Sequence, residues 1–154
     1  MALTKELRCV LVKDTCYIQD YARVEYEDGM RYAYGGIFAV DQKNATEVGK
    51  VIKIMLSTPL KIISEEEHMK KLNSKEVTLM LRITKTKSYG ALAKISKGVT
   101  IEFMGNDNQV KFIPYKKIDS KGGRQPMEDK SIVANIDDEE ELGQTLLQAF
   151  EISQ

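Results

Sequence analysis

The residue types that most often carry out catalysis are scarce in this chain. Its one histidine, His68, follows three glutamates and precedes Met69 and two lysines. Histidine is the usual proton shuttle near neutral pH, but these charged neighbours indicate an exposed helical residue, so we do not expect His68 to act as a general base. The glycine pairs at 35–36 and 122–123 lack the other residues of a phosphate-binding loop, and the sequence has no G-x-S-x-G or H-E-x-x-H motif and no calcium loop. A paired-carboxylate site cannot be seen from sequence alone, but these absences favour a protein that is not an enzyme.

The two cysteines do not form a recognisable metal motif. Cys9 and Cys16 are separated by strand-like sequence, and two thiols fall short of the four ligands that a structural zinc site takes. We expect both to be free thiols in a reducing compartment. The sequence therefore predicts no metal site and no cofactor.

Tyrosines gather in one stretch of the N-terminal third. Four of the seven tyrosines lie between positions 21 and 34, interleaved with carboxylates and glycines, without the long apolar period of a core element. Tyrosine offers a large rigid ring with a hydroxyl group and is enriched at interface hot spots. We predict a partner-binding surface that consists of Tyr21, Glu25, Tyr26, Glu27, Asp28, Tyr32 and Tyr34. The alternative is that these rings pack on a sheet with their hydroxyl groups in water.

Charge is balanced over the whole chain but not along it. Basic and acidic residues number 23 each, whereas residues 82–124 hold 10 basic and 3 acidic residues and residues 125–154 hold 1 basic and 8 acidic residues. The simpler interpretation is that the two blocks neutralise each other in the fold. The alternative is a surface with two faces of opposite sign, which would steer charged partners.

Helices are predicted where capping residues precede apolar residues at helical spacing. Asn44 with Glu47 and Asp138 with Glu141 are capping-box pairs, and they open helices predicted over 44–57 and 138–152. Ser64 with Glu67 is a third capping pair, and it opens a short helix predicted over 64–71. The apolar stripes of the two long helices consist of Val48, Val51, Ile52, Met55 and Leu56, and of Leu142, Leu146, Ala149 and Phe150. Gly143, inside the last helix, costs about 1 kcal/mol relative to alanine, which predicts close packing at that position.

Strands are predicted at 7–12, 77–84, 99–104, 109–113 and 131–136, with a further strand possible around Cys16–Ile18. The third and fourth runs flank turn-forming residues and predict a β-hairpin, and Pro114 is expected at the end of an edge strand. The polar, glycine-bearing segment 119–126 is expected to be a surface loop. These elements predict an α+β fold: a mixed, largely antiparallel sheet covered by a few helices, in a single domain over residues 1–154.

Length and hydropathy exclude several classes of protein. A chain of 154 residues can bury roughly 70% of the surface that it exposes when unfolded. No apolar stretch approaches the ~20 residues that span a bilayer, and charges occupy the start, where a signal peptide needs an apolar run. We therefore expect a cytoplasmic protein that does not contact membranes.

The second half of the chain, about residues 80–153, resembles the immunity proteins of bacterial contact-dependent growth inhibition. The resemblance lies in an order of features: Lys87-Ser88, the stretch Leu92-Ala93-Lys94, the hairpin strands 99–103 and 110–114, a glycine-bearing loop, the strand 132–136, and the ending 141–150. That ending, E-L-G-x-x-L-x-x-A-F, is its most specific part. Residues 1–75 carry no such resemblance.

The resemblance implies a protein-binding function. Such immunity proteins lie in the cytoplasm of the producing cell, bind the C-terminal toxin domain delivered by sibling cells, and occlude its active site or substrate path without catalysis of their own. The toxins are commonly nucleases and often basic, so the carboxylates of the tyrosine-rich stretch would complement them. The expected partner is a cognate toxin C-terminal domain, and the resemblance assigns no contact residues.

A binding module associated with nucleic acid, or a regulatory one, is the alternative function. The basic residues that suggest it are Arg82, Lys85, Lys87, Lys94, Lys97, Lys111, Lys116, Lys117, Lys121 and Arg124. The pI of about 6.6 argues against this alternative, because nucleic-acid-binding domains are usually strongly basic. We therefore expect no direct contact with nucleic acid.

Overall fold

The computed structural model describes residues 5–24, 31–32, 36–73, 78–103, 105, 107–119, 121 and 123–154. Seven strands form the main sheet: β1 (Lys5–Val12), β2 (Thr15–Asp20), β5 (Ile37–Asp41), β7 (Ser96–Phe103), β8 (Gln109–Lys117), β9 (Arg124–Pro126) and β10 (Ile132–Asn135). A small sheet consists of β3 (Ala22–Val24), β4 (Arg31–Tyr32) and β6 (Lys61–Ile63). The helices are α1 (Ala45–Ser57), α2 (Glu65–Asn73), α3 (Leu79–Thr84), α4 (Tyr89–Ile95) and α5 (Glu139–Ile152), with a short 3-10 helix at Glu128–Lys130.

The main sheet has the order β10-β8-β7-β1-β2-β5, and β9 pairs with the far end of β8. Its pairs are antiparallel, whereas β3 and β6 of the small sheet run parallel. This arrangement confirms the predicted α+β fold with a mixed, largely antiparallel sheet. The predicted hairpin is also confirmed as β7 and β8.

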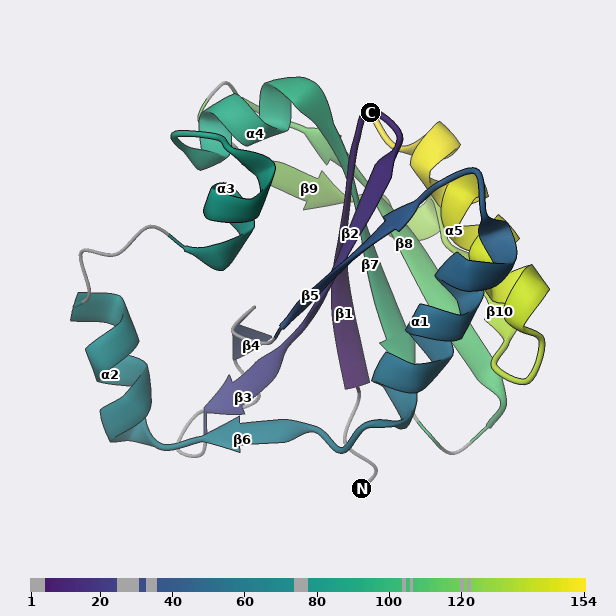
Figure 1. Cartoon of the computed structure of the whole chain (residues 1–154), viewed down its shortest axis with the longest axis horizontal. Helices are drawn as coiled ribbons and strands as arrows, with labels where there is room; N and C mark the ends of the chain where they lie inside the picture. Colours follow the sequence, from purple (N-terminus) through teal and green to yellow (C-terminus); the bar gives the residue numbers. More distant parts are fainter. Residues whose placement is uncertain are drawn as a thin grey trace.

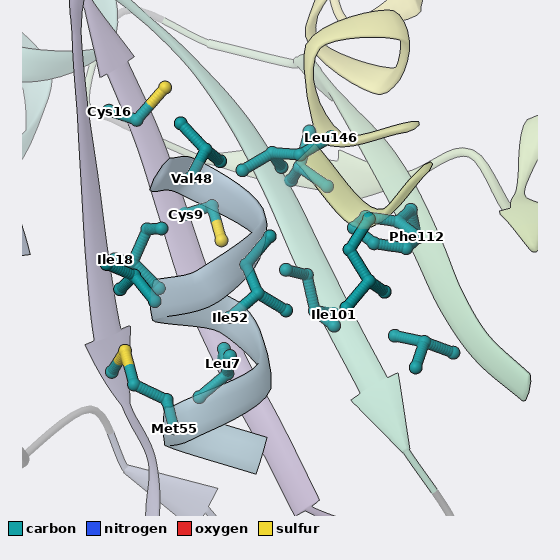
Figure 2. Close-up of a cluster of buried hydrophobic side chains, with 14 of the residues drawn as sticks. Leu7, Cys9, Cys16, Ile18, Val48, Ile52, Met55, Ile101, Phe112 and Leu146 are labelled. Carbon is teal, nitrogen blue, oxygen red and sulfur yellow. The ribbon is translucent and has the colours of Figure 1, made fainter. Parts of the chain in front are cut away.

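Helices α1 and α5 lie side by side over one face of the main sheet (Figure 1). All three predicted caps are present, because the Asn44, Asp138 and Ser64 side chains accept hydrogen bonds from the backbone N–H groups of Glu47, Glu141 and Glu67 at 3.1, 3.0 and 3.1 Å. The last of these caps belongs to α2. The predicted apolar stripes of α1 and α5 are buried in one core with side chains from the strands (Figure 2), which include Leu7, Ile18, Ile101 and Phe112.

The two covering helices approach each other at two glycines. A side-chain carbon on Gly49 of α1 would collide with the main-chain oxygen of Glu139, and one on Gly143 of α5 would collide with that of Ala45. The close packing predicted at Gly143 is confirmed, and Gly49 is its counterpart on the facing helix.

The opposite face of the sheet is covered in part by α3 and α4. Met80, Leu81 and Leu92 bury Val10 of β1 in a second, smaller cluster, and Figure 1 shows these two short helices apart from α1 and α5. The strand predicted over 77–84 is therefore wrong, because its described part forms helix α3. The adjacent side chains of Met80 and Leu81 are both buried in the cluster with Val10. A helix allows this, whereas successive side chains of a strand point to opposite faces.

Pro114 lies within β8 and not at the end of an edge strand, so that prediction is wrong. Strand β10 pairs with β8 up to Phe112, and β9 pairs with it from Tyr115. The Pro114 carbonyl accepts a hydrogen bond from the Met127 N–H at 2.8 Å in the interval between them. The N–H and C=O of a strand residue point to the same side. Pro114 therefore lacks its N–H on the side of β8 between the ends of β10 and β9, where no strand hydrogen bond is lost. The segment predicted as a surface loop, 119–126, ends in strand β9.

Candidate protein-binding site

The predicted tyrosine-rich surface is only partly described by the structure. Five of its residues lie outside the described residues: Glu25, Tyr26, Glu27, Asp28 and Tyr34. Tyr32 lies in β4, where the structure describes its backbone but not its side chain. Tyr21 follows β2 directly, and its backbone N–H donates to the Glu6 carbonyl at 3.3 Å. The prediction can therefore be examined at Tyr21, and for the other residues it stays a prediction.

Tyr21 belongs to the face of the main sheet that α1 and α5 leave uncovered. Successive side chains of a strand point to opposite faces. Leu7 and Cys9 point into the helix-covered core, so Arg8 points to the opposite face. Thr100 is the register partner of Arg8 on β7 and shares this face.

A hollow of about 170 Å³ opens on this face. We call it the arginine–tyrosine hollow, and its lining residues are Arg8, Cys9, Tyr21, Gly98, Val99, Thr100, Tyr115 and Arg124. The hollow crosses the centre of the sheet, because these residues come from β1, β7, β8, β9 and the end of β2. Arginine and tyrosine are the residue types enriched at interface hot spots, together with tryptophan.

Arg124 is held in the hollow by contacts with β7. Its Nη2 donates to Ser96 Oγ at 2.6 Å and lies 3.4 Å from the Ser96 carbonyl oxygen. Its Nη1 lies over Gly98, where a side-chain carbon would collide with it. Burial lowers the pKa of Arg124, and the nearby positive charge of Arg8 lowers it further. The guanidinium group is therefore fixed in a half-buried position beside a like charge.

Arg8 is the second cation of the hollow, and Tyr89 orients it. The Arg8 guanidinium carbon lies 5.2 Å from the centre of the Tyr89 ring, within the distance at which the face of an aromatic ring attracts a cation. The Tyr89 hydroxyl lies 3.0 Å from Thr78 Oγ1. Helix α4 thus places an aromatic ring at the edge of the hollow and holds Arg8 there.

The tyrosines form walls of the hollow. Burial raises the pKa of Tyr21, while the charge of Arg8 and a side-chain hydrogen bond with Thr100 act in the opposite direction. The Tyr21 hydroxyl is thus neutral and already engaged near neutral pH. Its place on the sheet also agrees with the alternative interpretation, in which the ring packs on the sheet.

The structure separates the two charge blocks. Lys13, Lys94, Lys97 and Lys117 surround a depression of about 300 Å³, and the Lys117 N–H bonds to the carbonyl of Gln154, just past the end of α5. Asp137, Asp138, Glu139 and Glu141 lie at the start of α5, about 20 Å away along this helix of 14 residues. The interpretation that the blocks neutralise each other holds for Lys111 and Glu128, which pair at 2.8 Å, but not for these two groups.

His68 is buried at 2% exposure, so the prediction of an exposed side chain is wrong. On a helix, residues adjacent in sequence point in different directions, and His68 faces the protein while the glutamates before it face water. Cys9 and Cys16 are free and buried. Among the described ranges, no three His, Cys, Asp or Glu side chains come together as metal ligands. No helix in the described part of the chain is long and apolar enough to cross a membrane.

Sequence reasoning did not group the residues of the hollow. Arg8 and Thr100 lie in predicted strands, on the polar parity of the alternation, and the sequence could have placed them on one face. Arg124 is one of ten basic residues in the segment 82–124, and no local pattern distinguishes it from the others. Its approach to Gly98 depends on β9, which the sequence did not predict.

Solved structures of other proteins share this fold. A protein of unknown function, NMB0488 from Neisseria meningitidis, is 12% identical with a TM-score of 0.74, over 98% of this chain and 96% of its own. A chain in the CdiA-CT/CdiI toxin and immunity complex from Yersinia pseudotuberculosis is 14% identical with a TM-score of 0.66, over 98% of both chains. No protein-family description matches the sequence, and no curated protein matches it. At these identities, the comparison establishes the fold that the chains share.

Proposed function

We propose that this protein binds and neutralises a toxin domain, as the immunity partner in a contact-dependent growth inhibition system. The observation that carries this proposal is the similarity of nearly the whole fold to a chain in a toxin and immunity complex. The resemblance of residues 80–153 to immunity proteins supports the immunity side of such a pair. The partner is a C-terminal toxin domain, for which the resemblance implies a nuclease.

The part of the chain that carries the sequence resemblance builds the scaffold. Strands β7, β8 and β10 and helix α5 contribute Ile101, Phe112, Ala134 and Leu146 to the main core. Similarity in these elements reflects packing, which leaves the binding surface free to differ between toxins. The contact residues of this protein therefore have to be found on its own surface.

Inhibition by binding needs hot-spot residues and no catalytic groups. The arginine–tyrosine hollow offers two arginines and two tyrosines on an open sheet face, and such residues dominate the free energy of many interfaces. We propose that this face contacts the toxin domain, together with the tyrosine-rich stretch that contains Tyr21. The protein acts in the cytoplasm, where the toxin domain arrives.

Co-expression tests this function directly. Whatever toxin domain is encoded beside the gene for this protein is expressed with it in a bacterial host, and survival is scored. We expect survival with the cognate toxin domain and none with an unrelated toxin domain of the same activity. Death in both cultures, with the protein folded and abundant, contradicts the proposal.

The lysine-lined depression favours a second candidate, a module that binds nucleic acid. Lys13, Lys94, Lys97 and Lys117 lie around one concave surface, and burial and nearby positive charges lower the pKa of Lys117. Binding of a generic DNA or RNA oligonucleotide would fall steeply with salt, because phosphate contacts release counterions. Salt-sensitive oligonucleotide binding that Lys97→Gln and Lys117→Gln weaken would favour this candidate.

A further inference from the structure

The arginine–tyrosine hollow holds two positive charges without a negative one. Arg8 and Arg124 line it, and none of its lining residues is acidic. Among the described residues, no carboxylate lies within ion-pair distance of either guanidinium group. Within the described ranges, the Arg8 guanidinium group contacts the Tyr89 ring and the Arg124 guanidinium group bonds to Ser96.

Hydrogen-bond donors of Arg124 remain available toward the hollow. A guanidinium group has five N–H donors, and Ser96 is bonded through Nη2 alone. Nη1 and Nε have no acceptor in the part of the chain that the structure describes. Burying a charge is unfavourable unless it is paired and hydrogen-bonded, and the mutual repulsion of Arg8 and Arg124 adds to this cost. An anion in the hollow would relieve both.

The size of the hollow restricts the kind of anion. Its volume of about 170 Å³ corresponds to roughly five or six water molecules, whereas sites for small-molecule ligands usually measure about 300–1,000 Å³. The end of one acidic side chain fits this space, which is smaller than most sites for small-molecule ligands. The Tyr21 and Tyr115 rings can pack against the methylene groups of such a side chain, and a guanidinium group binds a carboxylate through paired hydrogen bonds.

We propose that the arginine–tyrosine hollow receives one aspartate or glutamate side chain of the bound toxin domain. This inference deepens the proposed function and rests on it for the identity of the partner. The carboxylate accepts hydrogen bonds from Arg124, which Ser96 and Gly98 position, and from Arg8, which Tyr89 positions. At the hollow, this protein supplies the positive charge and the toxin domain the negative charge. At the acidic tyrosine-rich stretch, the expected charges are the other way round.

The site can be tested without the toxin. The full-length protein, labelled with 15N, is titrated with N-acetyl-glutamate amide and followed by NMR, with the uncharged N-acetyl-glutamine amide as the matched control. We expect saturable shifts of the Arg8 and Arg124 side-chain signals and of the Thr100 amide with the glutamate compound alone. Absence of saturable shifts with the glutamate compound, or equal shifts with both, overturns the proposal.

Variants locate the binding. Arg124→Gln and Arg8→Gln should each weaken binding of the glutamate compound about tenfold or more, as expected for loss of a charge-assisted hydrogen bond. Arg124→Lys should restore part of it, since charge returns without the paired donors. Arg82→Gln, an exposed position on α3, is the control and should leave binding unchanged. If Arg124→Gln fails to fold, Arg8→Gln still decides, and undiminished binding by the folded variants overturns the proposal.

Phosphate is the competing source of negative charge. Inorganic phosphate and a short single-stranded DNA are titrated in parallel, and tighter binding of the DNA at Arg8 and Arg124 than of the glutamate compound overturns the proposal in favour of nucleic acid. Co-expression with the toxin domain is scored separately. Binding of the glutamate compound without protection from the toxin would contradict the proposed function but support the carboxylate site. Protection from the toxin without binding of the glutamate compound would support the proposed function but overturn the carboxylate site.

Discussion

Gly143 of α5 lies against the main-chain carbonyl oxygen of Ala45 in α1, at a distance that leaves no room for a side-chain carbon. The reciprocal contact joins Gly49 of α1 to the carbonyl of Glu139 at the start of α5. The two helices that cover the main core are therefore brought together by two glycines. Their closeness lets Val48, Leu142 and Leu146 share one core.

Gly143→Ala should destabilise the protein, although alanine is the better helix former. The methyl group would collide with backbone, which cannot rotate away, so we expect a loss of about 1–3 kcal/mol, as for other overpacked cores. Gly36→Ala is the matched control, since a side-chain carbon there meets nothing within 4 Å. Urea unfolding measures both, and a Gly143→Ala variant as stable as the control would contradict the close approach.

The ion pair between Lys5 and Asp20 should contribute strongly to stability. The Lys5 ammonium group lies 2.7 Å from the Asp20 carboxylate, with the side chains 6% and 18% exposed. Removal of one partner of a buried pair leaves an uncompensated charge, so Asp20→Ala should cost about 3 kcal/mol. The exposed pair of Glu66 and Lys70 at 3.8 Å supplies the control, because Glu66→Ala should cost about 0.5 kcal/mol or less. Equal losses in the two variants would show that Lys5 is not confined to the interior.

Cys9 and Cys16 should resist thiol reagents in the folded protein. Burial raises the pKa of Cys9 well above its ordinary value and that of Cys16 to about 12, with the charge of Asp41 adding to the latter. The thiolate is the reactive form, so we expect iodoacetamide to modify neither cysteine near neutral pH until urea unfolds the chain. Mass spectrometry reads the result, and rapid modification of the native protein would refute it.

The same shift predicts a loss of stability in alkali. The folded protein keeps the Cys16 thiol protonated above the pKa of the unfolded chain, about 8.5. Its contribution to the free energy of unfolding is therefore complete below that pH and declines as pH rises toward 12. Cys16→Ala should show a shallower fall than the parent protein over this range in urea titrations. If the free energy of unfolding of the two proteins fell equally with pH, deprotonation of Cys16 would not contribute to the loss of stability.

The two long helices could be predicted from the sequence because their signals are local. Capping pairs at Asn44 and Asp138 and apolar residues at helical spacing lie within each helix, and the structure confirms both. Strand β1 and the β7–β8 hairpin were also predicted, since alternation and turn residues are local too. Strand β5 was not predicted, although it pairs with β2 over its full length.

The failures have a common cause in tertiary packing. Residues 77–84 were predicted as a strand because they alternate, yet Leu79–Thr84 forms α3, where Met80 and Leu81 together cover Val10. The Lys85 backbone ends this helix in a left-handed conformation with φ 57°, which no local pattern announced. The arginine–tyrosine hollow likewise depends on β9 bringing Arg124 over Gly98, a contact between distant parts of the chain.

Tyr21 distinguishes a binding surface from a structural role for the tyrosine-rich stretch. If its ring contacts the toxin domain, Tyr21→Ala should weaken the complex by about 2 kcal/mol, roughly thirtyfold. Tyr21→Phe, which keeps the ring, should retain most of the affinity. Thermal unfolding of both variants is the control. A large drop in melting temperature for Tyr21→Ala, with affinity for the toxin unchanged, would assign the ring to packing on the sheet.

The affinity between this protein and the toxin domain proposed as its partner, sought in the neighbouring gene, is the most direct test of the proposed function. Isothermal titration calorimetry on the purified pair should give a dissociation constant on the order of 10⁻⁸ M or tighter, as for other specific interfaces of standard size. Arg124→Gln should raise that constant about tenfold or more, and Arg82→Gln should leave it unchanged. The absence of any complex between the two folded proteins would contradict the account.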